Sequence, residues 1–172
     1  MIIGIDGNEA NVLHKVGVSV YTINLLKYFH AQASEELQFV IYLRKPPQAD
    51  LPQATDYFSY QIVWGPILWS QVFLPLHLWI NKLMGKKLQV FFSPAHYIPR
   101  FCPFPTVVTV HDLSYLYFPH EFLKKDLYQL KNWTEYALKK SAQIIAVSKT
   151  TKKDIVHEYS IPERKIEVVY NG

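Results

Sequence analysis

The hydrophobic and polar positions along the chain predict alternating strands and helices. Seven short apolar runs, several rich in β-branched or aromatic residues, have the length of buried strands. They are Met1–Asp6, Leu37–Arg44, Tyr60–Trp64, Leu88–Ser93, Thr106–Val110, Ala142–Val147 and Lys165–Tyr170. Apolar residues at helical spacing predict helices at about 17–32, 67–84, 122–140 and 149–159. This alternation indicates an α/β fold, with a mostly parallel sheet of about seven strands covered on both faces.

The run Thr106–Val110, which follows Pro105, stops at an imidazole and a carboxylate, His111 and Asp112. Ligands of open α/β sheets bind just beyond the carboxyl ends of the strands, so the pair lies where chemistry is expected if the sheet is parallel. A His-Asp pair at a strand end is also common as a loop cap or a satisfied core pair. The position alone therefore marks His111 and Asp112 as candidates and leaves both interpretations open.

A second candidate site follows the first predicted strand. The loop Lys15–Ser19 contains Gly17 and leads into the first predicted helix. The free N–H groups and the positive dipole end of a helix N-terminus favour anions, and a glycine lets a phosphate approach the backbone. The loop matches neither the Gly-x-Gly-x-x-Gly fingerprint nor the P-loop, so it indicates an anion site without naming the ligand.

The segment Ile67–Met84 is apolar nearly all round and is followed by Gly85-Lys86-Lys87. Pro75 is expected to kink it or to split it into two helices. The favoured interpretation is a buried crossover helix. The alternative is an interfacial helix that contacts lipid, because aromatic residues followed by lysines are typical of such anchors.

Composition narrows the class of protein. The 172 residues suffice for one ordinary domain, and 49% hydrophobic with 19% charged residues predicts a packed core. A net charge of +4 suits an anionic partner, but no Lys/Arg block of the nucleic-acid-binding type is present. The single cysteine, Cys102, allows no intramolecular disulfide and fits a reducing compartment. No signal peptide and no uninterrupted apolar run of about 18 residues is visible, so we expect a cytoplasmic protein.

Several segments share their order and spacing with one known family. They are Gly17–Tyr21, Phe91–Pro94, Val107–Leu113, Ile144–Ile155 and Ile161–Gly172. Together they resemble the N-terminal domain of family 4 glycosyltransferases, which are retaining enzymes of the GT-B architecture. The segment Trp69–Leu76 is similar to the mannosyl- or rhamnosyltransferase-type branch of that family.

The resemblance implies one half of a GT-B fold, a Rossmann-like three-layer sandwich. Residues 1–172 would form the N-terminal, acceptor-side domain, and the C-terminal, donor-binding domain would be absent from this chain. Asn171-Gly172 matches the point where such enzymes cross into that second domain. We therefore expect the isolated domain to be inactive.

The family's functional positions carry over to five residues. Gly17 matches the glycine that approaches the donor phosphate or the reacting sugar, although this loop has one glycine where many members have two. His111 matches the histidine that contacts the donor sugar near the reaction centre, and Asp112 matches its acidic neighbour, which fixes the loop. Ser148 and Lys149 match a Val-Ser-Lys turn at the cleft wall, where Ser148 is equally well explained as a helix cap.

The predicted function is transfer of a hexosyl group, with retention, from a nucleotide-sugar to a glycan or lipid-linked acceptor, as in polysaccharide biosynthesis. No Asp-x-Asp occurs in the chain, so no metal and no other cofactor is predicted. The predicted location is the cytoplasm, at the inner face of the membrane, with peripheral contact through Ile67–Met84. The alternative is a non-catalytic Rossmann-like binding module for a membrane surface or a protein partner. A nucleotide-sugar epimerase of the same architecture is a third, less favoured option.

Overall fold

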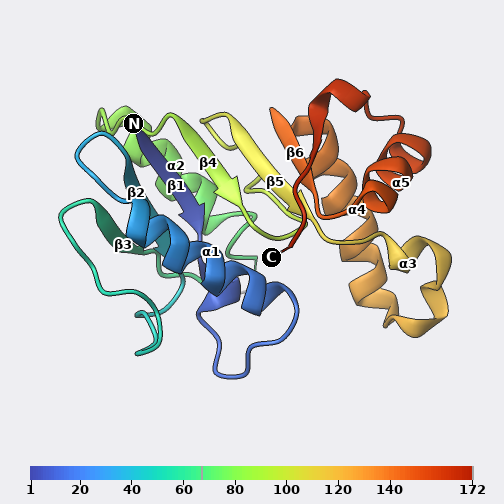
Figure 1. Cartoon of the computed structure of the whole chain (residues 1–172), viewed down its shortest axis with the longest axis horizontal. Coiled ribbons are helices and arrows are strands. Elements are labelled where there is room, and N and C mark those ends of the chain that lie inside the picture. The colour runs from blue at the N-terminus through green and yellow to red at the C-terminus, as the bar shows by residue number, and fades with distance from the viewer. Residues whose placement is uncertain (67, 172) are drawn as a thin grey trace. The chain divides into compact units, whose positions relative to one another are not determined.

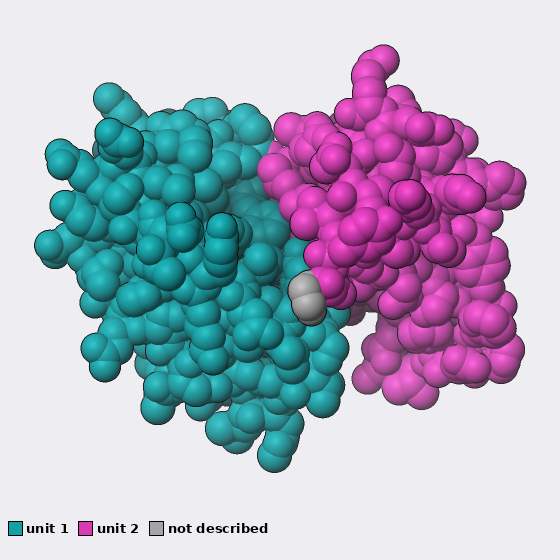
Figure 2. Space-filling view, in the orientation of Figure 1, with its two compact units in different colours: residues 1–94, 99–105 teal, residues 95–98, 106–172 magenta. Residues whose placement is uncertain are grey.

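The computed structural model describes residues 1–66 and 68–171. Its strands follow the order β3-β2-β1-β4-β5-β6-β7 in the sheet, and helices connect most of the strands that are consecutive in sequence (Figure 1). The chain divides into two compact units, residues 1–94 with 99–105 and residues 95–98 with 106–171 of the described part (Figure 2). The predicted α/β, Rossmann-like fold with seven parallel strands is confirmed.

The first unit contains four parallel strands in the order β3-β2-β1-β4. Ile5 of β1 lies opposite Ile41 of β2 on one side and Phe92 of β4 on the other. The strand bounds are β1 Ile2–Asp6, β2 Gln38–Leu43, β3 Phe58–Ile62 and β4 Val90–Ser93. The helices are η1 Asn8–Ala10, α1 Val18–Gln32 and α2 Phe73–Leu83.

One core of this unit lies between the sheet and α2. Tyr42, Leu74, Leu78 and Phe91 are almost completely buried, and together with Trp69 they belong to one hydrophobic cluster. Polar groups within it are paired, since the Trp69 Nε1–H donates to the Val63 carbonyl at 2.6 Å. Large apolar side chains thus fill this side of the sheet, with their hydrogen-bonding groups satisfied.

The structure corrects two expectations about the segment 67–84, of which residue 67 lies outside the described part. Pro75 does not split the helix, because it is the third residue of α2, where its missing N–H has no intrahelical carbonyl to meet. The helix is also not simply buried. Its inner face is Leu74, Pro75, Leu78 and Asn81, whereas the exposed apolar residues are Leu76, Trp79, Ile80 and Leu83.

The second unit contains three parallel strands in the order β5-β6-β7. Their bounds are β5 Thr106–Val110, β6 Gln143–Ala146 and β7 Ile166–Val168. The helices are α3 Ser114–Tyr117, η2 Pro119–Glu121, α4 Lys124–Lys140, α5 Lys149–Tyr159 and η3 Glu163–Lys165.

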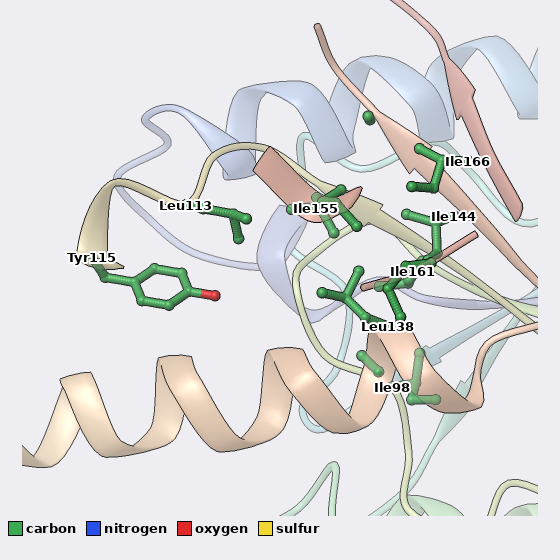
Figure 3. Packing of buried hydrophobic residues seen from close by; sticks show 12 residues of the cluster. Ile98, Leu113, Tyr115, Leu138, Ile144, Ile155, Ile161 and Ile166 are labelled. Atoms are coloured by element: carbon green, nitrogen blue, oxygen red, sulfur yellow. The ribbon is translucent and has the colours of Figure 1, made fainter. Parts of the chain in front are cut away.

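Aliphatic side chains from these strands and helices form a separate core (Figure 3). Leu138 of α4, Ile144 of β6 and Ile155 of α5 are completely buried there. The hydroxyl of the buried Tyr115 lies 2.9 Å from the Tyr159 hydroxyl. This core supports β5 and the N-terminal end of α5, the two elements that carry the candidate site.

Among the helices of the described residues, none combines the length and the apolar character needed to cross a bilayer.

Candidate functional site

The structure places His111 and Asp112 directly after β5, as predicted. β5 is buried at four of its five positions, and the chain leaves the sheet at His111. Asp112 then accepts two hydrogen bonds at Oδ1, from the Ser114 N–H at 2.9 Å and the Ser114 hydroxyl at 2.6 Å. A carboxylate that bonds the backbone two residues ahead forms a turn, and here the turn starts the short helix α3.

Asp112 is ionised at neutral pH. Partial burial acts to raise the pKa of its carboxyl group, but the two hydrogen bonds from Ser114 and the nearby His96 and His111 outweigh burial and lower it. The carboxylate therefore fixes the loop after His111 and leaves a negative charge beside both imidazole rings.

The N-terminal end of α5 is tied to the same loop. The Thr151 hydroxyl donates to the His111 carbonyl oxygen at 3.1 Å. The Ser148 hydroxyl accepts a hydrogen bond from the Thr151 N–H at 3.0 Å, which makes Ser148 the N-cap of α5. Lys149 follows as the exposed first residue of the helix. The positive end of the α5 dipole thus lies next to the backbone of His111.

Sequence reasoning did not select His96 as a site residue. Its ring centroid lies 5.5 Å from that of His111, and its Nδ1 is buried without a hydrogen-bond partner among the described residues. Burial, and secondly the charge of His111, lower the pKa of His96 to about 4 against a smaller opposing effect of Asp112. His96 is therefore neutral at physiological pH. The sequence signal was its place between Pro94 and Pro99, just after β4.

Gly17 belongs to the other unit, where it is the N-cap residue of α1. Its backbone has φ +49° and ψ −113°, a conformation open mainly to glycine. A Cβ added there would meet no atom within 4 Å, so glycine is required by conformation and not by crowding. The contact of this loop with a ligand stays a prediction.

Asp6, the carboxylate that ends β1, lies in the same unit as Gly17. Its Oδ1 accepts from the Asn8 N–H at 3.1 Å and from the Asn8 side-chain amide at 3.0 Å. Burial nevertheless raises the pKa of Asp6 to about 6, with the Asn8 hydrogen bonds opposing that shift. The carboxyl group at the end of β1 thus takes up a proton as the pH falls to about 6.

No group of three or more His, Cys, Asp or Glu side chains is arranged to hold a metal ion within residues 1–66 and 68–171. The absence of a metal from the reaction itself stays a prediction.

A family model places the chain among known proteins. Glycosyltransferase Family 4 matches residues 16–172. Of curated proteins, the O-antigen chain mannosyltransferase RfbU of Salmonella typhimurium is 31% identical over 65 residues, which are 38% of this chain and 18% of RfbU.

Two solved structures share the fold. Anabaena Alr3699/HepE, in complex with UDP and glucose, aligns with a TM-score of 0.56 and 16% identity over 99% of this chain and 44% of that one. Os79 from O. sativa, in complex with UDP, aligns with a TM-score of 0.52 and 6% identity over 100% of this chain and 52% of that one. The chain thus spans about half the length of these structures. At such identities they show the fold alone, whereas the family model covers nearly every residue, and the chain belongs to glycosyltransferase family 4.

Proposed function

We propose that the chain is the N-terminal, acceptor-side domain of a retaining hexosyltransferase that uses a nucleotide-sugar and a glycan or lipid-linked acceptor. The observation that carries the proposal is the cluster of His111, Asp112 and the N-terminal end of α5 at the carboxyl end of β5 in a family 4 chain. RfbU is an O-antigen chain mannosyltransferase, which supports mannose as the sugar and polysaccharide synthesis as the process. The UDP in both solved relatives supports a nucleotide-sugar donor.

In this proposal the candidate residues have different roles in the transfer reaction. The His111 imidazole contacts the transferred sugar near its anomeric carbon, where it can donate to a hydroxyl or orient the acceptor. Asp112 holds the loop, because its carboxylate is bonded to Ser114. The helix end at Ser148-Lys149 supplies N–H groups and positive charge to the departing diphosphate, which gains negative charge as the glycosidic bond breaks. Gly17, which starts α1 in the other unit, is proposed separately as an anion site.

The test is sugar transfer by the full-length protein with GDP-mannose and UDP-glucose as donors. We expect His111→Ala to lose at least tenfold in kcat/KM, since general acid–base and orienting contacts contribute on the order of 100-fold or more. His157→Ala is the matched control, because His157 is an exposed histidine on α5 that bonds Glu158. Wild-type activity in His111→Ala would contradict the assigned role. An altered nucleotide-sugar with no transfer would instead favour the epimerase.

A second proposal concerns a membrane surface. The outer face of α2 exposes Leu76, Trp79, Ile80 and Leu83, and the neighbouring Phe101 is exposed at a positive φ of 52°. This aromatic residue is fixed to the helix, because the Trp79 Nε1–H donates to the Phe101 carbonyl at 2.8 Å. An exposed apolar face of this kind is typical of a surface that contacts a protein or a membrane.

Charge favours lipid as that partner. Lys82, Lys86 and Lys87 lie on or just after α2, and the sequence has no acidic residue between Asp56 and Asp112. An apolar face with lysines beside it suits an anionic bilayer, where aliphatic side chains enter the acyl boundary and lysines meet the headgroups. A domain that accepts lipid-linked substrates would gain from this contact, and the cytoplasmic face of the membrane would be its location.

Vesicle sedimentation tests this contact. We expect the wild type to bind vesicles containing phosphatidylglycerol, to bind phosphatidylcholine vesicles weakly, and to lose binding in Leu83→Glu. The matched control is Leu13→Glu, since Leu13 and Leu83 are exposed to 80% and 81% in the same unit. The contact is refuted if the wild type stays in the supernatant with anionic vesicles, or if both variants bind alike.

A further inference from the structure

Three half-buried histidines of the described residues have a buried ring nitrogen, and His96 differs from the other two. A ring nitrogen of His30, of His77 and of His96 is buried without a hydrogen-bond partner in that part of the chain. His30 forms a T-shaped ring contact with Phe58, and His77 forms one with Tyr42. His96 also has an aromatic neighbour, Tyr97. Unlike the other two, it packs beside His111, at the carboxyl end of β5.

From this position we propose that His96 is a positioning residue, whose Nδ1 hydrogen-bonds a hydroxyl group of the sugar held against His111. This inference rests on the proposed function. It adds a residue that neither the sequence motifs nor the family resemblance selected. In this role His96 determines the specificity for sugars that carry the hydroxyl over sugars that lack it.

Two prolines and two packed side chains anchor the loop that carries His96. His96 lies between Pro94 and Pro99, whose rings restrict the backbone. The next residue, Tyr97, packs edge-to-face on Trp133 of α4, with ring centroids 5.3 Å apart, and Ile98 is buried in the core of the same unit. Tyr97 and Ile98 thus anchor the loop that carries the imidazole, and the buried Nδ1 must be uncovered for the sugar hydroxyl to reach it.

The chemistry of the ring selects the class of ligand. A neutral imidazole has one donor and one acceptor nitrogen, and a sugar hydroxyl can pair with either. The Asp112 carboxylate lies close enough to influence His96, so a phosphate or carboxylate would meet like charge there. A neutral hydroxyl is the group that fits. A buried nitrogen that pairs only with the correct sugar also penalises an analogue without that hydroxyl.

The experiment measures kcat/KM of the full-length protein with GDP-mannose, UDP-glucose and their monodeoxy analogues. We expect His96→Phe to lose about tenfold with the preferred donor, the effect of one hydrogen bond to a neutral group. It should not lower the melting temperature, because an apolar ring relieves a buried unpaired nitrogen. His96→Asn, which keeps a polar atom near the place of Nδ1, should recover part of the loss. The control His30→Phe should transfer sugar like the wild type.

The deoxy analogues separate positioning from packing. With the analogue that lacks the contacted hydroxyl, wild type and His96→Phe should have equal kcat/KM, whereas a packing defect would slow every donor alike. A change in the His96 ¹⁵N signals of the wild type when the donor is added is expected as well, and it needs no variant.

Three results are decisive in different ways. Wild-type kcat/KM and wild-type selectivity in His96→Phe overturn the role of His96 and leave the proposed function standing. Equal loss with all donors, together with unchanged ¹⁵N signals, also overturns it. If the wild type transfers no sugar from either donor while His96 and the fold are intact, the proposed function fails, and the role of His96 fails with it.

Discussion

Among single residues, Asp6 and His96 oppose each other in the pH dependence of stability. The pKa of Asp6 is about 6, above its ordinary value of 3.8. Between these two pH values the folded state therefore keeps a proton on Asp6 that the unfolded chain releases. Asp6 therefore contributes stability at low pH that is lost as the pH rises through about 6. The pKa of His96 is about 4, below its ordinary 6.5. Its contribution is present above pH 6.5 and is lost as the pH falls towards about 4.

Substituting Asp6 or His96 should remove its contribution to the pH dependence of stability. The difference in unfolding free energy between Asp6→Asn and the wild type should increase by about 2 to 3 kcal/mol in favour of the variant as the pH rises from 4 to 7. Each pKa unit corresponds to about 1.4 kcal/mol. The same difference for His96→Phe should change by a similar amount in the opposite direction, against the variant, as the pH rises from 4 to 7. Denaturant unfolding at pH 4, 5.5 and 7 measures both effects. Curves that stay parallel to the wild type would show that neither group titrates as described.

At the scale of elements, the strands and helices that end in strong local signals could be predicted closely. Thr106–Val110 and Lys149–Tyr159 agree with β5 and α5 residue for residue, because Pro105 and the Ser148 cap fix their starts. The third strand was placed two residues late, since its bounds depend on pairing with β2, where Phe39 lies opposite Phe58. Such a register is set by long-range pairing that a linear pattern does not contain.

The candidate site was predictable in its motif residues and not in its contacts. His111, Asp112 and Ser148 stand out because they follow buried strands. His96 also follows a buried strand, β4, but its contact with His111 joins residues from two different loops, which the sequence does not show. The helix α3 was also missed, because four residues show no periodicity and its start depends on the Asp112 side chain.

The loop before α1 offers a test at the element scale. Gly17→Ala should lower the unfolding free energy by about 1 to 3 kcal/mol, because a Cβ is strained at φ +49° although nothing crowds it. Thermal or denaturant unfolding measures this loss, and Val16→Ala, a change at the exposed neighbouring residue, is the control. If Gly17→Ala is as stable as the wild type, the loop does not require a positive φ at residue 17.

At the scale of the whole molecule, each unit has a hydrophobic core of its own. Tyr42, Leu74 and Phe91 belong to one, and Leu138 and Ile155 belong to the other. The alternation of strands and helices runs through the chain without a break, so the sequence pattern predicts one sheet and gives no sign of a division into two units. That division reflects contacts between distant residues, which periodicity does not reveal.

The last prediction concerns catalytic competence. The chain covers 44% and 52% of the two solved structures that share its fold, and an acceptor-side domain, as proposed, leaves most of the donor binding to a second domain. The 172-residue chain alone should therefore show no sugar transfer from GDP-mannose or UDP-glucose, while the full-length protein does. Circular dichroism and a cooperative melt of the isolated chain are the controls, because they separate a missing donor site from a failure to fold. Transfer by the isolated chain at the full-length rate would contradict the acceptor-side assignment, since residues 1–172 would then contain every group that the reaction requires.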